Sequence, residues 1–145
     1  MKTQLLVATL AAGLAAGLTA CGTQPQTPPM LASLDALPGT QWALAEPAAA
    51  ALPLGQQPEL QFVSSTQVAG NSGCNRFAGA LRLGGGGLQM GPLAGTRRAC
   101  AGELMAIESR VLRALDATRS ARLEPGQLVL LDGRGAELMR WVQRR

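Results

Sequence analysis

Cysteine is the residue type of this sequence best suited to covalent chemistry, and it occurs three times, as Cys21, Cys74 and Cys100. The sequence contains no histidine. Ser-His-Asp and Cys-His nucleophiles, histidine zinc sites and the usual general base near neutral pH are therefore excluded. Three cysteines are too few for a four-cysteine zinc site or cluster, and the scattered acidic residues lack the D-x-D spacing of a calcium loop. We expect no enzymatic activity, no metal and no other cofactor.

The N-terminus is a short apolar run that ends at a cysteine. The run from Leu5 to Ala20 carries no charge, and it is shorter than the about 20 apolar residues that a membrane-spanning helix needs. It ends in Leu18-Thr19-Ala20-Cys21, which is similar to the lipobox, whose cysteine is acylated and becomes the first mature residue. We therefore expect Cys21 to carry acyl chains such as palmitate, and Gly22 after it is typical of outer-membrane sorting. The alternative is an ordinary signal peptide with an incidental cysteine.

This interpretation divides the chain into three parts. Residues 1–20 are expected to form the signal peptide. Residues 21–38 would be the lipidated cysteine and a tether rich in proline, as in Gln24-Pro25-Gln26-Thr27-Pro28-Pro29, because such composition favours extended, semi-rigid chain. Residues 39–145 are predicted to form one domain of ordinary size.

Short runs with β character occupy most of this domain. Four consecutive glycines at 84–87 separate two of the runs and predict a hairpin, and Glu124-Pro125-Gly126-Gln127 has the Pro-Gly order of a type II turn. The predicted strands are 41–44, 59–63, 67–69, 80–83, 88–90, the two halves of 123–131 on either side of that turn, and 137–142.

One segment, 103–117, has the periodicity of a helix. Its apolar residues recur at helical spacing and predict one buried face, formed by Leu104, Ile107, Val111, Leu112 and Leu115. The charged residues, Glu108 among them, are expected to point largely away from that face. The order of elements predicts an α+β fold, mainly antiparallel β, in which one helix covers a sheet.

Two motifs carry a resemblance to a known family. The segment from Gly70 to Gly79 reads GNSGCNRFAG, and Thr96 to Cys100 reads TRRAC just before the predicted helix. Together they resemble the META domain family of HslJ-type envelope proteins, with Trp42 and Glu108 also at matching positions. The resemblance covers nearly all of 39–142, although Ala80 and Leu81 stand where many members have an aromatic residue. It implies a strongly curved, barrel-like antiparallel sheet packed by one helix.

Cys74 and Cys100 remain once Cys21 is assigned to lipid. An oxidising envelope compartment permits a disulfide between them, which would stabilise the domain by about 3.5 kcal/mol in the chain-entropy model. Two buried free thiols are the first alternative. A reactive Cys100 before the helix is the second, and it is disfavoured because no histidine exists to act as its base.

The first motif permits two interpretations. Because Gly and Asn tolerate positive φ, Gly70, Asn71, Gly73 and Asn75 suit a tight crossing between strands. The functional alternative is a ligand-binding loop formed by Asn71, Gly73 and Asn75, to which Arg97 would add an anionic contact. Adjacent arginines such as Arg97 and Arg98 are more often solvated surface.

The expected function is that of a non-enzymatic lipoprotein anchored in the outer membrane and facing the periplasm. The resemblance implies a role in heat or antibiotic tolerance, through binding a periplasmic protein or envelope polymer. A small-molecule binder and an inhibitor of an envelope-targeting hydrolase such as lysozyme are the alternatives. No nucleic-acid partner is expected, because the arginines form no stripe interleaved with aromatic residues.

Overall fold

The computed structural model describes residues 33–45, 52 and 55–144. The predicted signal peptide, Cys21 and most of the predicted tether lie outside these residues. The last part of the tether segment is described: Leu34–Ala36 form a short 3-10 helix, and Leu37 is fully buried in the core. The packed domain therefore reaches back to about residue 33, ahead of the predicted start at residue 39.

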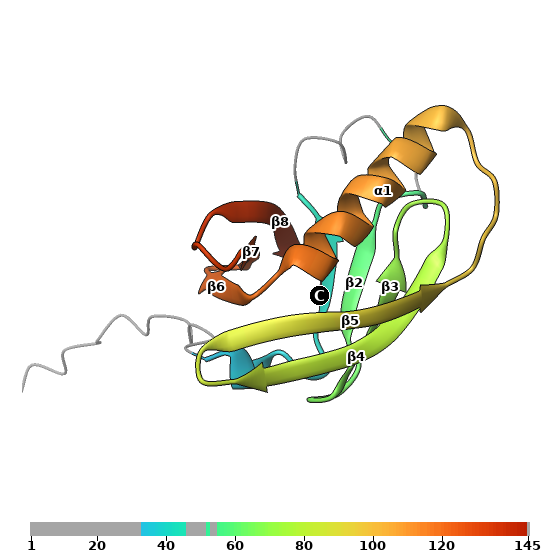
Figure 1. The fold of residues 1–145 in the computed structure, drawn as a ribbon. Helices are drawn as coiled ribbons and strands as arrows, with labels where there is room; N and C mark the ends of the chain where they lie inside the picture. Colours follow the sequence, from blue (N-terminus) through green and yellow to red (C-terminus); the bar gives the residue numbers. More distant parts are fainter. Residues whose placement is uncertain (1–32, 46–51, 53–54, 145) are drawn as a thin grey trace, which may run out of the picture.

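The described residues contain eight antiparallel strands that close into a ring (Figure 1). Strands that follow one another in sequence pair with each other, and β1 pairs with β8 to close the ring. This confirms the predicted mainly antiparallel fold. The strands are β1 (Gln41–Leu44), β2 (Glu59–Phe62), β3 (Gln67–Asn71), β4 (Arg76–Gly84), β5 (Gly87–Gly95), β6 (Ser120–Glu124), β7 (Gln127–Leu131) and β8 (Glu137–Gln143).

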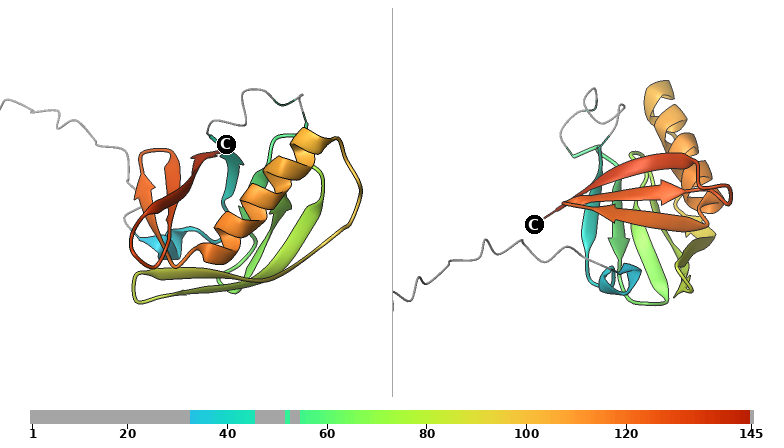
Figure 2. Two further views of the ribbon diagram at one scale, coloured as in Figure 1. Left: turned by 45° about the horizontal axis from the view of Figure 1, so that its top comes forward. Right: turned by 90° about the vertical axis from the view of Figure 1, so that its left-hand side faces the viewer.

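The ring is not an even barrel. β5 and β6 meet at a single residue pair, Gly87 with Ser120, and then diverge. The helix α1 (Gly102–Ala117) crosses this open side and contacts β5, β7 and β8 (Figures 1 and 2). A single helix thus supplies the wall that strand pairing leaves open.

Strands β4 and β5 are much longer than the predicted 80–83 and 88–90. The sequence signal for residues 76–79 of β4 and 91–95 of β5 is weak because glycines interrupt the apolar alternation. A Cβ atom on Gly79 would lie 2.5 Å from the carbonyl oxygen of Pro92, so only glycine allows β4 and β5 to approach here. The same strand pair changes register between Gly79 and Leu81. Residues 76–79 of the GNSGCNRFAG motif are therefore strand and not loop.

The interior of the ring is filled with large apolar side chains. Trp42 on β1, Trp141 on β8 and Phe62 on β2 are fully buried. From α1, Ile107, Val111 and Leu115 join the same core as predicted, whereas Leu104 and Leu112 are only partly buried.

The expectation that Glu108 points away from the apolar face was wrong. Glu108 is 9% exposed, and it lies one helical position after the buried Ile107. Its carboxylate contacts the β3–β4 loop through hydrogen bonds described below. These hydrogen bonds offset the cost of burying a charge.

Candidate functional site

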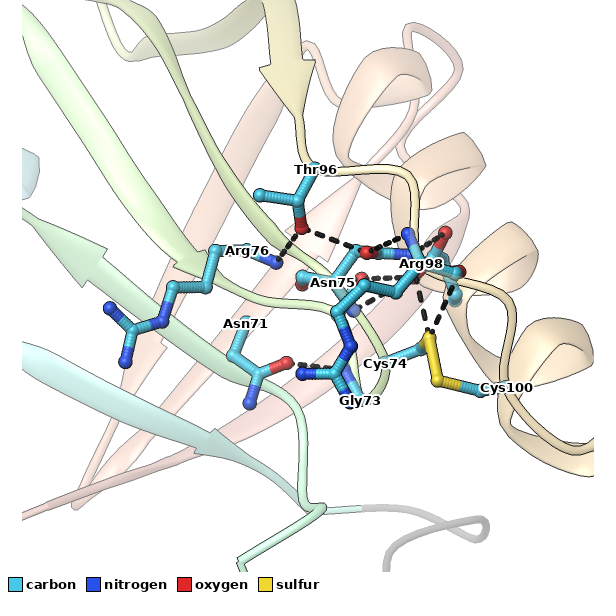
Figure 3. Close-up of a disulfide and its surroundings, with 10 residues drawn as sticks. Asn71, Gly73, Cys74, Asn75, Arg76, Thr96, Arg98 and Cys100 are labelled. Carbon is cyan, nitrogen blue, oxygen red and sulfur yellow. Dashed lines mark hydrogen bonds between the residues drawn. A yellow bond between two sulfur atoms is a disulfide. The ribbon is translucent and has the colours of Figure 1, made fainter.

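The two sequence motifs meet at one place, where the β3–β4 loop (72–75) lies against the segment that leads into α1 (Figure 3). Cys74 and Cys100 form a disulfide there, with Cα atoms 6.1 Å apart. The predicted pair is therefore confirmed, and the alternatives of two free thiols and of a reactive Cys100 do not apply. The disulfide joins the loop to the chain two residues before the helix begins.

Asn75 ties three segments together through its side chain. Its Oδ1 accepts hydrogen bonds from the Thr96 hydroxyl and the Arg98 backbone N–H, both at 2.8 Å. Its Nδ2 donates to the Arg98 carbonyl oxygen at 3.1 Å and to the Glu108 carboxylate at 3.0 Å. Asn75 is buried, and both polar atoms of its side chain are engaged inside the protein.

Glu108 completes this arrangement from the helix. Its Oε2 accepts hydrogen bonds from the Ser72 hydroxyl at 2.8 Å and from the Asn75 backbone N–H at 3.0 Å, in addition to the Asn75 side chain. Hydrogen bonds to an ionised carboxylate are about twice as strong as neutral ones. Among the described residues no arginine or lysine forms an ion pair with Glu108. The carboxylate is therefore held by hydrogen-bond donors of the loop.

The tight crossing is made by fewer residues than predicted. Gly73 has φ of +109°, a conformation that side chains rarely adopt. Its backbone N–H donates to the Asn71 side chain at 2.9 Å, which fixes the turn. Gly70 and Asn71 are instead the last two residues of β3. Gly70 is needed for close packing, because a Cβ atom there would lie 2.6 Å from the Phe77 ring.

These contacts make the loop, the disulfide and Glu108 a structural brace, which we define as Ser72, Cys74, Asn75, Cys100 and Glu108. Four of these residues, all except Glu108, belong to the two sequence motifs. Glu108 was at a family-matching position but was assigned to the wrong face. Its hydrogen-bond partners lie 33 and 36 residues away, so local periodicity could not reveal them.

A surface cavity of about 330 Å³ lies next to the brace. It is lined by Asn71 and by the side chains or backbone of Arg76 and Arg98, among others. Arg97, the predicted contact to an anion, is exposed and does not line this cavity. The binding role of Asn71, Gly73, Asn75 and Arg97 stays a prediction, as does the acylation of Cys21.

Within residues 33–45, 52 and 55–144, no group of three or more cysteine, aspartate, glutamate or histidine side chains is placed to bind a metal. No helix in the same ranges is long and apolar enough to cross a bilayer.

A closed ring of eight antiparallel strands, one helix across its gap and a disulfide brace define a small disulfide-bonded β protein. The chain belongs to the META domain family, which matches residues 35–145. Membership of this family indicates an envelope-associated protein, and the family is not one of known enzymes.

Two solved structures have the same fold. An NMR structure of a protein from Burkholderia xenovorans has a TM-score of 0.61 and 28% identity, over 75% of this chain and 84% of that one. A second NMR structure has a TM-score of 0.59 over 74% of this chain and 91% of that one, and at 24% identity it supports the fold alone. A comparison with curated proteins finds no significant match.

Proposed function

We propose that this META domain protein is a lipid-anchored, non-enzymatic binding module of the bacterial cell envelope, attached through Cys21 to the outer membrane and facing the periplasm. Its role would be tolerance of envelope stress such as heat or antibiotics, exerted by binding a periplasmic protein or an envelope polymer.

The observation that carries this proposal is the Cys74–Cys100 disulfide. Structural disulfides persist in oxidising compartments such as the periplasm and are rare in the cytosol. With these two cysteines paired, Cys21 is the remaining thiol of the sequence. Its position in the lipobox-like Leu18-Thr19-Ala20-Cys21 is where acylation would occur.

The chemistry of the site supports binding over catalysis. Ser72, Asn75 and Glu108, the polar side chains buried in the brace, are engaged with one another and with the loop. The two cysteines are oxidised, and no histidine is available as a general base. Arg76 and Arg98 at the adjoining cavity offer hydrogen bonds and positive charge, which suit recognition of a ligand.

The anchor is tested by growing cells that express the full-length protein with an alkyne-labelled palmitate. We expect label on the wild-type protein and its recovery in the outer-membrane fraction. Cys21→Ser should lose the label and should no longer be found in the outer-membrane fraction. Cys74→Ser should keep the label and should remain in that fraction. Label retained by Cys21→Ser would overturn the proposal.

The physiological role is tested separately. A strain lacking the protein should survive heat or antibiotic challenge less well than the parent. Complementation with wild type, but not with Cys21→Ser, should restore survival. Equal survival of all strains under every challenge would contradict the stress role while leaving the anchor intact.

A further inference from the structure

The cavity beside the brace adjoins a second one on the outer surface of the sheet. The second cavity has a volume of about 310 Å³, and it is lined by residues of β1, β2, β3 and β4 and by Arg144. Both cavities are lined by Asn71 and Arg76, so they are neighbouring parts of one depression, which we call the Arg76 groove. Each part alone reaches the lower end of the size range of small-molecule sites, about 300 to 1,000 Å³.

The groove carries positive charge that no carboxylate of the described residues neutralises through an ion pair with Arg76 or Arg98. Figure 3 shows the Arg76 and Arg98 side chains on either side of Asn71. Neither guanidinium forms an ion pair with any residue that the structure describes. Glu59 is the single carboxylate among the residues that line the two cavities, and Arg144 binds it at 2.9 Å. An anion in the cavity that Arg76 and Arg98 both line would therefore find two guanidinium groups without an ion pair to the described residues.

Glutamine side chains also line the groove, beside apolar residues such as Leu60, Phe77 and Leu104. Gln41 and Gln61 line the part over the sheet, and Gln56 lines the part beside the brace. The Asn71 side chain uses its oxygen to accept from Gly73 and has no hydrogen bond from its Nδ2 to the described residues. Primary amides donate and accept at once, as hydroxyl groups do, so several of them in one groove match a polyhydroxylated molecule. Guanidinium groups match phosphate and carboxylate with paired hydrogen bonds.

We propose that the Arg76 groove binds an anionic sugar unit, with its phosphate or carboxylate between Arg76 and Arg98 and its hydroxyl groups on the amides of Gln41, Gln61 and Asn71. This inference rests on the proposed function, since it names the chemistry of the envelope ligand. It does not require the anchor at Cys21, which lies in a different part of the sequence.

The test titrates the full-length protein in detergent micelles by calorimetry with glucose 1-phosphate, glucuronate and glucose. We expect both anionic sugars to bind and glucose to bind at least about tenfold more weakly, because it lacks the group that forms charge-assisted hydrogen bonds. Inorganic phosphate should also bind more weakly than glucose 1-phosphate, because it makes no contact with the amides. The tighter of the two anionic sugars identifies phosphate or carboxylate as the preferred group.

Variants assign the binding to the groove. Arg76→Gln and Arg98→Gln should each lower the affinity for the more tightly bound anionic sugar by about tenfold. Arg98→Lys should lower it by less, because lysine keeps the charge but cannot form two parallel hydrogen bonds. Arg113→Gln is the matched control, since Arg113 is exposed on α1 and loses the same charge. Its affinity should equal that of the wild type. Thermal unfolding of each variant should match the wild type, because neither groove guanidinium has a described partner.

Three results would overturn the inference: no binding of either anionic sugar, inorganic phosphate binding as tightly as glucose 1-phosphate, or equal losses in Arg98→Gln and Arg113→Gln. The Cys21→Ser variant distinguishes failure of the sugar-binding groove from failure of the proposed function. It should bind the sugars as the wild type does, even though it is no longer attached to the membrane. Failure of the groove and failure of the anchor are thus observed independently.

Discussion

Asn75 is the residue on which the local structure depends most directly. Its side chain joins the β3–β4 loop, the segment before α1 and the helix itself; its contact with Glu108 is buried, and those with Thr96 and Arg98 are partly buried. Asn75→Ala would leave the Arg98 backbone N–H and the Glu108 carboxylate without these partners. Buried polar groups that lose their partners are costly, so we expect the free energy of unfolding to fall by about 2–4 kcal/mol. Urea denaturation measures this loss.

Asn71→Ala is the matched control for this substitution. Asn71 is also an asparagine of the motif, but its side chain accepts one hydrogen bond, from the Gly73 N–H, and it is only partly buried. We expect a loss of about 1 kcal/mol or less. Equal losses at the two positions would show that Asn75 is not the centre of the brace.

At the scale of elements, the disulfide attaches the start of α1 to the β3–β4 loop. It closes a separation of 26 residues, so the chain-entropy model predicts about 3.5 kcal/mol of stabilisation. Reduction with dithiothreitol should lower the midpoint of urea denaturation, and the Cys74→Ser/Cys100→Ser double variant should have that lower midpoint with or without reductant. A midpoint in the double variant that still moves with reductant would contradict this account.

The turn between β7 and β8 is expected to make stability depend on pH. The backbone N–H groups of Ala136 and Arg134 donate to Asp132 and hold the pKa of its carboxyl below the ordinary value of 3.8. Since the unfolded chain binds this proton more readily, the stabilisation is present above that value and is lost as the pH falls through the lower folded pKa. The melting temperature should therefore drop on acidification, and less steeply in Asp132→Asn.

Arg134→Ala is the control for the pH experiment. It removes the ion pair of Arg134 with Asp132, whose N–O distance is 3.6 Å, but keeps both backbone donors. Because the backbone hydrogen bonds are the larger cause of the lowered pKa, this variant should keep most of the wild-type pH dependence. A pH dependence as flat as that of Asp132→Asn would assign the effect to the ion pair.

At the scale of the whole molecule, the sequence predicts well which faces of the strands and the helix are buried. It predicts poorly where two segments of the chain pack closely together. The predicted bounds of β1 agree with the structure, and those of α1 differ by one residue, because apolar periodicity identifies a buried face. The outer half of β4 was missed, because Gly79 is there to let β5 approach and has no side chain to reveal its environment. Glu108 was misplaced for a related reason: its burial depends on donors from a loop far away in the sequence.

Ring closure also makes a prediction about how the molecule unfolds. Trp42 on β1 and Trp141 on β8 are buried beside the seam where the first and last strands pair, whereas α1 covers the gap between β5 and β6. Tryptophan fluorescence therefore reports the seam, and far-ultraviolet circular dichroism reports mainly the helix. Both elements enclose one core, so the two signals should change at the same urea concentration, as in a two-state transition.

Removal of β8 is a second test of whether the ring and the helix unfold as one cooperative unit. A chain that ends at Ala136 lacks the partner of β1 and two buried core residues, Met139 and Trp141. If the ring is one cooperative unit, this chain should lose the helical signal as well, although α1 is intact in its sequence. A control that ends at Gln143 removes only Arg144 and Arg145 and should keep a single sharp transition. Separate midpoints in the wild type, or a helical transition that survives the loss of β8, would mean that the helix and its adjoining strands fold independently of the seam.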